Sequence, residues 1–350
     1  METILVLLHT ESDGSLPRSG LEAVGAARGL QAQLSGSTLI AGLVGGEVQD
    51  AAGALGGCGA TRLLTVSGPD FTQSRYASDA AAAEAICQAA GATVIVAPGT
   101  SRWLRALPGV AQRLSGRVDT HVTGLAVEQG APLVSRWYYR QRMEASLTRT
   151  QRPWLILVDP GCQVPWQGGG AAIAPEPVAV ALPDACRRTA VTGLQAPTAD
   201  QQTIRPDADL LLVAGAGWTK KQADGQAHGG EAAELIQGFL RLSQASLGGS
   251  KSLVDLKGEG QAVLPFMTHL NQVGQTGATP RHPKGLSTCC HGEEPHVVGW
   301  RFITERRAVN LDPNCGWARG KTDVLYVADA FAVMRCLNAL LTEQAARPKA

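Results

Sequence analysis

The chain has 350 residues, of which 44% are hydrophobic and 17% charged, and its net charge at pH 7 is +1. This length predicts about two domains, and the composition excludes a disordered chain. The near-zero charge lacks the basic surplus typical of nucleic-acid-binding proteins, and no apolar run is long enough to span a bilayer. The short apolar segment Ile4–Leu8 follows an acidic residue, Glu2, whereas a signal peptide carries basic residues before its apolar region. We therefore expect a buried first strand and a cytoplasmic protein, itself outside the membrane.

In the first half, apolar strand-like runs alternate with helix-like segments. The predicted strands are 4–8, 38–44, 62–66 and 93–97, and the predicted helices are 21–34, 48–55, 76–90 and 101–114. This repeated β-α order predicts a parallel sheet with helices on both faces. Three more predicted strands follow with short turns between them, at 120–127, 133–139 and 154–158. They indicate a hairpin-like edge added to the parallel sheet.

The second half repeats the α/β pattern after a segment of different composition. Residues 163–208 are rich in Gly, Pro and Ala, with only a possible strand at 178–181, and are predicted as a linker. The later predicted strands are 209–214, 252–254, 297–301, 307–310 and 324–328, and the predicted helices are 231–247 and 330–343. We therefore predict an α/β protein of two Rossmann-like parallel-sheet domains, with an N-terminal domain at 1–162 and a C-terminal domain at 209–345.

The cysteines and histidines do not predict a metal site. There are eight cysteines and no C-x-x-C pair, which leaves a disulfide framework or a zinc ribbon without support. A cluster could be drawn from Cys289, Cys290, His291, His296 and Cys315, but its spacing matches no standard zinc template. No Ser-His-Asp order or paired carboxylates indicate hydrolysis, so no catalytic residue is predicted.

The loop Gln272–Gly277 combines two glycines, an amide and a hydroxyl. Glycine lets a backbone approach a flat or charged ligand closely. Gln and Thr side chains hydrogen-bond carbonyl and imine edges without adding charge. These properties suit a cofactor ring better than a metal or a scissile bond. By itself, the loop could equally be an ordinary tight turn.

Several motifs in the same order resemble the alpha subunit of electron transfer flavoproteins. In the first half these are Ala97–Ser101 and the run from Val118–Leu125 to Val158–Gly161. In the second half, Gln272–Gly277 reproduces the family's flavin loop, and His296 and Asn310 follow at close to the family's spacing. A turn at Asn310–Pro313 and a closing Asp329 with Phe331 complete the resemblance. Several motifs in the right order make chance an unsatisfactory explanation.

The resemblance implies a heterodimer of alpha and beta subunits. The C-terminal domain of the alpha subunit would hold most of an FAD, and the N-terminal domain would contact the beta subunit, which usually binds AMP. The pair would carry electrons from a partner dehydrogenase to a membrane quinone reductase or another acceptor. The chain would be an electron carrier with no substrate turnover of its own, because the flavin performs the redox chemistry.

The resemblance also implies roles for individual residues. Gln275 and Thr276 would lie at the isoalloxazine edge, His296 near the pyrimidine carbonyl, and Asn310 and Asp329 at the adenosine or ribose side. Ser250 and Lys251 take the place of the family's Ser-Arg pair. Lys251 keeps the positive charge but lacks the planar guanidinium group of arginine. The cofactor-binding positions implied are Gly215, Ser250, Lys251, Val273, Gly274, Gln275, Thr276, Gly292, His296, Asn310, Asp329 and Ala330.

The chain departs from the family pattern at three places. The glycine-rich turn Ala214–Trp218 lacks the family's arginine, although Lys220 and Lys221 follow closely. The segment His291–His296 carries two carboxylates and a proline, and the stretch 255–272 is longer than in the family. Two other interpretations therefore stay open: a flavin-free scaffold subunit, and an adenine-nucleotide-binding module, each pairing with a beta-like subunit.

Overall fold

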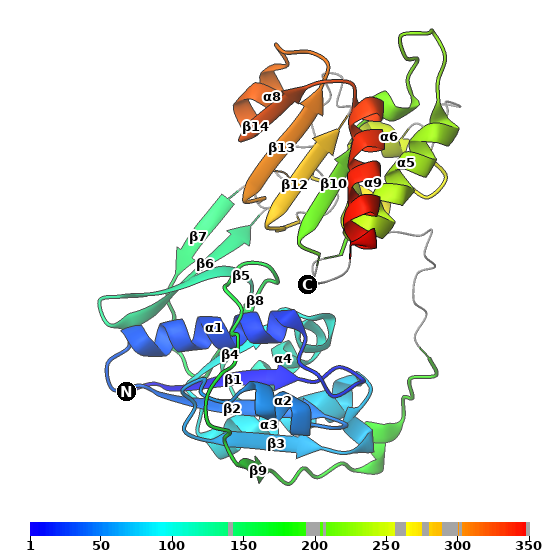
Figure 1. Cartoon of the computed structure of the whole chain (residues 1–350). Helices are drawn as coiled ribbons and strands as arrows, with labels where there is room; N and C mark the ends of the chain where they lie inside the picture. The colour runs from blue at the N-terminus through cyan, green and yellow to red at the C-terminus, as the bar shows by residue number, and fades with distance from the viewer. Residues whose placement is uncertain are drawn as a thin grey trace. The chain divides into compact units, whose positions relative to one another are not determined.

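A computed structural model describes residues 1–138, 143–193, 204–205, 208–255, 264–274, 280–288, 300 and 303–347 (Figure 1). The chain divides into two compact units, Met1–Leu194 and Gln195–Ala350. Each is a Rossmann-like α/β unit built on a mainly parallel sheet, which confirms the predicted fold class. The first unit includes the described part of the segment after residue 162, since β9 (Pro175–Pro177) pairs with β3 (Leu63–Ser67).

In the part described, the first unit contains a nine-stranded sheet. Its other strands are β1 (Thr3–His9), β2 (Thr38–Gly45), β4 (Val94–Pro98), β5 (Arg117–Glu128), β6 (Ala131–Tyr138), β7 (Met143–Leu147) and β8 (Trp154–Val158). Its helices are α1 (Arg18–Gln33), α2 (Gln49–Ala54), α3 (Tyr76–Ala90) and α4 (Ser101–Arg113), with short 3₁₀ turns η1 (Pro69–Phe71) and η2 (Asp184–Arg187). The strand order is β7-β6-β5-β8-β4-β1-β2-β3-β9. All pairs are parallel except β5-β6 and β6-β7, so the predicted antiparallel edge is present and continues into β7, which was not predicted.

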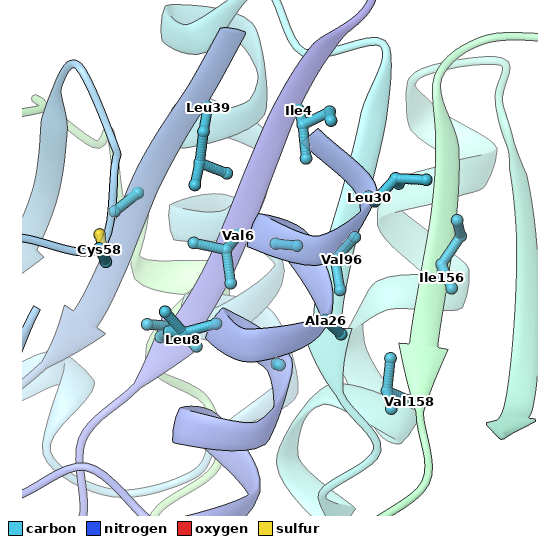
Figure 2. Close-up of a cluster of buried hydrophobic side chains, with 14 of the residues drawn as sticks. Ile4, Val6, Leu8, Ala26, Leu30, Leu39, Cys58, Val96, Ile156 and Val158 are labelled. Carbon is cyan, nitrogen blue, oxygen red and sulfur yellow. The ribbon is translucent and has the colours of Figure 1, made fainter. Parts of the chain in front are cut away.

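The core of the first unit lies on both faces of β1. Successive side chains of a strand point to opposite faces. Figure 2 shows Ile4, Val6 and Leu8 in one buried cluster with Ala26 and Leu30 of α1. The alternate residues of β1 belong to a second cluster with α3 and α4. A strand buried on both faces therefore needs a continuous apolar run, which is why this strand was predictable from the sequence.

The strand order of the first unit reverses between β1 and β4, where α/β folds usually bind ligands. His9, at the end of β1, is buried at this position with 5% of its surface exposed. Its Nδ1 faces the Thr10 carbonyl at 3.2 Å, so Nδ1 carries the hydrogen, and Nε2 accepts from the Thr100 hydroxyl at 2.9 Å. The ring edge also packs on Trp103, with centroids 5.7 Å apart. A buried imidazole of the chain itself thus lies at the strand-order reversal.

One buried carboxylate holds the antiparallel extension to the parallel sheet. Asp119 on β5 accepts hydrogen bonds from Arg136 on β6 at 2.9 Å and from Arg149, beyond β7, at 2.7 and 2.9 Å. It also accepts from Trp154 Nε1 on β8 at 2.9 Å. Burial raises the pKa of Asp119, but the hydrogen bonds from Arg149 and Trp154 outweigh burial and keep the pKa below its usual range. The carboxylate therefore stays charged and paired at neutral pH.

The second unit contains a five-stranded sheet in the part described. The strands are β10 (Leu210–Ala214), β11 (Ser246–Gly249), β12 (Lys284–Thr288), β13 (Glu305–Asn310) and β14 (Val324–Val327). The helices are α5 (Gly229–Ser243), α6 (Lys251–Asp255), α8 (Gly316–Lys321) and α9 (Ala330–Ala346), with 3₁₀ turns η3 (Ala216–Thr219) and η5 (His269–Asn271). The strand order is β11-β10-β12-β13-β14, and every pair is parallel. The order reverses between β10 and β12, and α5 packs against α9 (Figure 1).

Several predicted elements of the second half are wrong. The predicted helix 231–247 ends at Ser243, because Gln244 adopts a left-handed φ of 56° and Leu247 belongs to β11. The predicted strand 252–254 lies in α6, and the possible strand at 178–181 is replaced by β9 just before it. The strand β12 and the helix α8 were not predicted. The predicted strand 297–301 lies outside the described residues apart from Trp300.

We expect His9 to make the unfolding free energy depend on pH. Burial, and then the positive charge of Arg102, lowers the pKa of His9 from 6.5 to about 4. Between these values the unfolded chain binds a proton that the folded chain does not, so stability falls as the pH drops from 6.5 to 4. His9→Gln should remove about 3 kcal/mol of this loss. Urea unfolding of the wild-type protein and of His9→Gln at several pH values between 4 and 6.5 measures this difference. If the unfolding free energies of the two proteins depend equally on pH, the assignment to His9 is wrong.

Candidate functional site

The described candidate residues gather at the carboxyl edge of the second sheet. Gly215 follows β10, while Ser250 and Lys251 follow β11. Val273 and Gly274 come after a parallel bridge that joins Gln272 to the end of β11 at Gly249. Asn310 ends β13, and Asp329 and Ala330 follow β14. Parallel strands end at one edge of a sheet, so these residues share that edge. The remaining predicted residues, Gln275, Thr276, Gly292 and His296, lie outside the described residues.

The turn after β10 is tied to the end of β12. The Gly215 N–H donates to the Thr288 carbonyl at 2.9 Å, and Trp218 Nε1 donates to the Thr288 hydroxyl at 2.9 Å. Trp218 is fully buried, and its ring lies 4.6 Å from that of Phe331. The turn that lacks the family's arginine is therefore packed around an indole.

Ser250 and Lys251 begin the helix after β11. The Ser250 N–H donates to the Ala214 carbonyl at 2.9 Å, and its hydroxyl accepts from the Leu253 N–H at 3.3 Å. The buried serine therefore caps the first turn of α6 and fixes it against β10. Lys251 is exposed and places a cation at the same edge of the sheet.

The segment leading to the flavin-like loop is held firmly against β11. The Asn271 side chain caps η5 with Thr268, and its Nδ2 donates to the Leu247 carbonyl at 3.2 Å. The Val273 N–H donates to the Gly249 carbonyl at 3.0 Å. Gly274 has a φ of +80°, a conformation that favours glycine, and its carbonyl accepts from Gln272 Nε2 at 3.3 Å. Residues 271–274 are thus fixed against the end of β11.

Two glycines of β11 allow this close approach, and sequence reasoning missed them. A Cβ added at Gly248 would lie 2.6 Å from Val273 Cγ2, and one at Gly249 would meet the end of Met267. The only sequence signal is the Gly248-Gly249 pair within an apolar strand, which is typical of a close backbone approach.

A small cavity lies between the ends of β13 and β14. Its volume is about 10 Å³, and it is lined by Gln222, Val309, Asn310, Leu311, Ala328, Asp329 and Ala330. Asn310 is 4% exposed, and its Oδ1 accepts from the Asp312 N–H at 3.0 Å. Its Nδ2 has no hydrogen-bond partner among the described residues. An unmatched buried amide is costly, so this donor favours a ligand or water that accepts from it.

Asp329 stands on the other side of this cavity and begins α9. Its Oδ1 accepts from the Ala332 N–H at 2.8 Å, which caps the helix. The carboxylate also contributes a negative charge at the cavity, so the cavity combines a neutral donor with an acidic acceptor. The two residues that were predicted together at the adenosine side do line one cavity.

A larger apolar groove lies on the face of the sheet that α5 and α9 cover. Its volume is about 500 Å³, and it is lined by Leu210, Phe239, Ser243, Lys284, Gly285, Leu286, Glu305, Arg307, Val309, Tyr326, Ala328, Val333, Leu337 and Leu341. The adjoining edge strand β14 exposes Val324, Tyr326 and Val327, the tyrosine by 46%. An exposed apolar edge strand is a surface that proteins usually cover.

The described ranges of the chain contain no metal-binding cluster. Within them, no group of three His, Cys, Asp or Glu side chains is placed to hold a metal ion. Likewise, none of the helices described is both long and apolar enough to cross a bilayer.

Two units built on mainly parallel sheets define a two-unit α/β protein, a fold class whose ligands usually bind at the carboxyl edge of the strands. Residues 4–185, just over half of the chain, match the model of the electron transfer flavoprotein domain. The chain therefore belongs to the electron transfer flavoprotein family, and its function is of that electron-transfer type. A search of the curated proteins finds no match to the chain. The matched residues lie in the first unit, whereas the candidate site lies in the second.

We expect Gly248→Ala to distort the segment before the loop. The added Cβ would overlap the stiff Val273 side chain, and such overpacking costs about 1–3 kcal/mol. Gly230→Ala in the first turn of α5 is the matched control, because its Cβ would meet no atom within 4 Å. Urea unfolding should show a loss of stability for Gly248→Ala alone. Equal stability of the two variants would mean that Val273 does not pack as described.

Proposed function

We propose that this chain is the alpha subunit of a heterodimeric electron transfer flavoprotein. It carries electrons on FAD from a partner dehydrogenase to a membrane quinone reductase or another acceptor, in the cytoplasm, and turns over no substrate of its own. Residues 209–345 form the FAD-binding domain, residues 1–162 contact the beta subunit, and residues 163–208 connect the two. The observation that carries this proposal is the unmatched Asn310 amide in a cavity among the predicted cofactor positions.

The described side chains fit an FAD stretched along the carboxyl edge of the second sheet. Asn310 offers a neutral donor, Lys251 a cation, and the Gly274 turn a close approach of the backbone. The bound flavin would supply the redox chemistry, and these residues would bind and orient it. Gln275 and Thr276 remain predicted at the flavin ring, and His296 at its pyrimidine carbonyl. Gly215, Ser250 and Val273 act as supports, because their hydrogen bonds and packing lie within the fold.

AMP, where the heterodimer contains it, belongs to the beta subunit in this proposal. The crevice between β1 and β4 in the first unit is the position where a nucleotide would otherwise bind. His9 is buried at this position and uses both ring nitrogens in contacts with Thr10 and Thr100. This arrangement supports a first unit that contacts a partner and binds no nucleotide itself.

The flavin content of the purified alpha–beta pair tests the proposal. We expect a yellow complex with the visible absorption of oxidised flavin, which bleaches on reduction and returns in air. A colourless pair that stays colourless after incubation with FAD would refute cofactor binding. In that case, retention of an adenine nucleotide by the isolated chain separates a nucleotide-binding module from a scaffold subunit.

We expect the exposed face of β14 to be covered by the beta subunit. Tyr326→Glu places a charge beside the apolar groove, and burying it in the complex would be unfavourable. The alpha–beta affinity should fall at least 10-fold, as measured by calorimetry, while the stability of the isolated chain changes little. Leu270→Glu, at a residue that is 72% exposed and outside the groove, is the control. Unchanged affinity for Tyr326→Glu would place the interface elsewhere.

A further inference from the structure

The stretch 255–272, which is longer than in the family, contributes to the core of the second unit. Residues 264–271 of this stretch, here named the support segment, bury the side chains of Leu264, Phe266 and Met267. All three belong to the same apolar cluster as residues of α5 and α9. The Met267 N–H also donates to the Leu264 carbonyl at 3.0 Å. The support segment is therefore anchored in the core and is not a loose surface loop.

Asn271 ends the support segment and links it to β11. Its side chain is buried, with 1% of the residue exposed. The Oδ1 atom accepts from the Thr268 N–H at 3.1 Å, and Nδ2 donates to the Leu247 carbonyl at 3.2 Å. One carboxamide thus uses its acceptor within the support segment and a donor on β11. An apolar side chain at this position could make neither bond.

The support segment and the residues after it meet β11 at its last residue, Gly249. Gln272 forms a parallel bridge with Gly249, and the Val273 N–H donates to the Gly249 carbonyl at 3.0 Å. The end of Met267 packs on Gly249, in space that a Cβ would fill. Ser250 follows directly and caps α6, and η5 contacts both α6 and β11. The segment 272–274 and the start of α6 are therefore held side by side.

Both of these elements carry predicted cofactor positions. Lys251 in the first turn of α6 provides a cation, and the Gly274 turn provides a close approach of the backbone. A cofactor that contacts both elements binds best when their relative position is already fixed in the free protein. If only a fraction of the molecules holds the segment in place, the apparent affinity falls by that fraction. A residue that fixes the segment therefore strengthens binding without contacting the cofactor.

We propose that Asn271 is a positioning residue for FAD, which acts by holding Gln272–Gly274 beside the start of α6. This inference rests on the proposed function. It assigns a role to a stretch in which the chain departs from the family pattern. Its consequence is that loss of the Asn271 bonds weakens FAD binding more than an equal loss of stability elsewhere in the unit does.

Titration of the flavin-depleted alpha–beta pair with FAD, followed by flavin fluorescence, measures the effect. Asn271→Asp keeps an acceptor for the Thr268 N–H but replaces the donor to Leu247 with a second oxygen. FAD binding should weaken by about 10-fold. Thr268→Ala is a milder change at an exposed residue, and it removes the hydroxyl that accepts from the Leu270 N–H. It should weaken binding by a smaller factor, whereas Thr268→Ser keeps the hydroxyl and should bind as wild type.

His282→Leu is the matched control for a loss of stability. His282 is 1% exposed, and its Nε2 donates to the Arg205 carbonyl at 2.7 Å. His282 and Asn271 each bond a backbone carbonyl from a buried position in the second unit, but His282 precedes β12 and is not among the predicted cofactor positions. Urea unfolding measures how much stability each variant loses. We expect FAD binding to weaken for Asn271→Asp and to stay unchanged for His282→Leu.

The contrary outcomes can be told apart. If Asn271→Asp and His282→Leu weaken FAD binding by the same factor, the effect is general destabilisation and the inference is wrong. If the Asn271 and Thr268 variants bind FAD as tightly as the wild type, the inference also fails, while the proposed function stands. Should Asn271→Asp not fold, the comparison of Thr268→Ala with Thr268→Ser decides. If the wild-type pair itself does not bind FAD, the proposed function fails as well.

Discussion

The parallel pairing of β10 to β14 is the constraint on which the candidate site depends. Each strand of this sheet ends at the same edge, so each following loop begins there. Gly215, Lys251, Asn310 and Asp329 are far apart in the sequence, yet each follows or ends a strand of the sheet. The location of the site is therefore set by backbone topology, and the side chains determine only what can bind there.

The two units share this topology but differ in what fills their carboxyl edges. In the first unit, His9 inserts a neutral imidazole at the strand-order reversal and hydrogen-bonds within the fold. The neighbouring Thr10 hydroxyl has no partner among the described residues, but it lies against Gly45 and lines no described cavity. In the second unit, Asn310 is equally buried and its Nδ2 has no partner among the described residues, and Asn310 lines a small cavity together with Gln222 and Asp329. Because Trp103 Nε1 beside His9 is also unmatched within the described ranges, the cavity next to Asn310, and not hydrogen-bond satisfaction alone, favours the second unit as the one that binds a ligand.

The sequence predicted those parts of the fold that carry strong apolar patterns. Strands such as Ile4–Leu8 are continuous apolar runs, whereas β12, with the sequence Lys284–Thr288, has a single large apolar residue, Leu286, and was missed. The predicted helix at α5 was too long, because Leu247 of β11 happens to continue the apolar spacing of the helix. Motif resemblance located Asn310 and Asp329, but Gln222 gave only a turn signal from the following Asp224-Gly225 pair. Its place in the cavity lining depends on how distant segments come together in three dimensions, which no local pattern encodes.

The absence of the family's arginine from the turn Ala214–Trp218 gives the neighbouring cations added significance under the proposed function. Within this turn, Trp218 is fully buried between Thr288 and Phe331. The indole stabilises the turn, and the turn itself brings no positive charge to the phosphates of a dinucleotide. The cations described at this edge are then Lys251 after β11 and Lys220 and Lys221 after η3. The segment that begins with Lys220 and Lys221 also continues into Gln222, which lines the cavity beside Asn310, so the charge and the cavity lie close together at this edge.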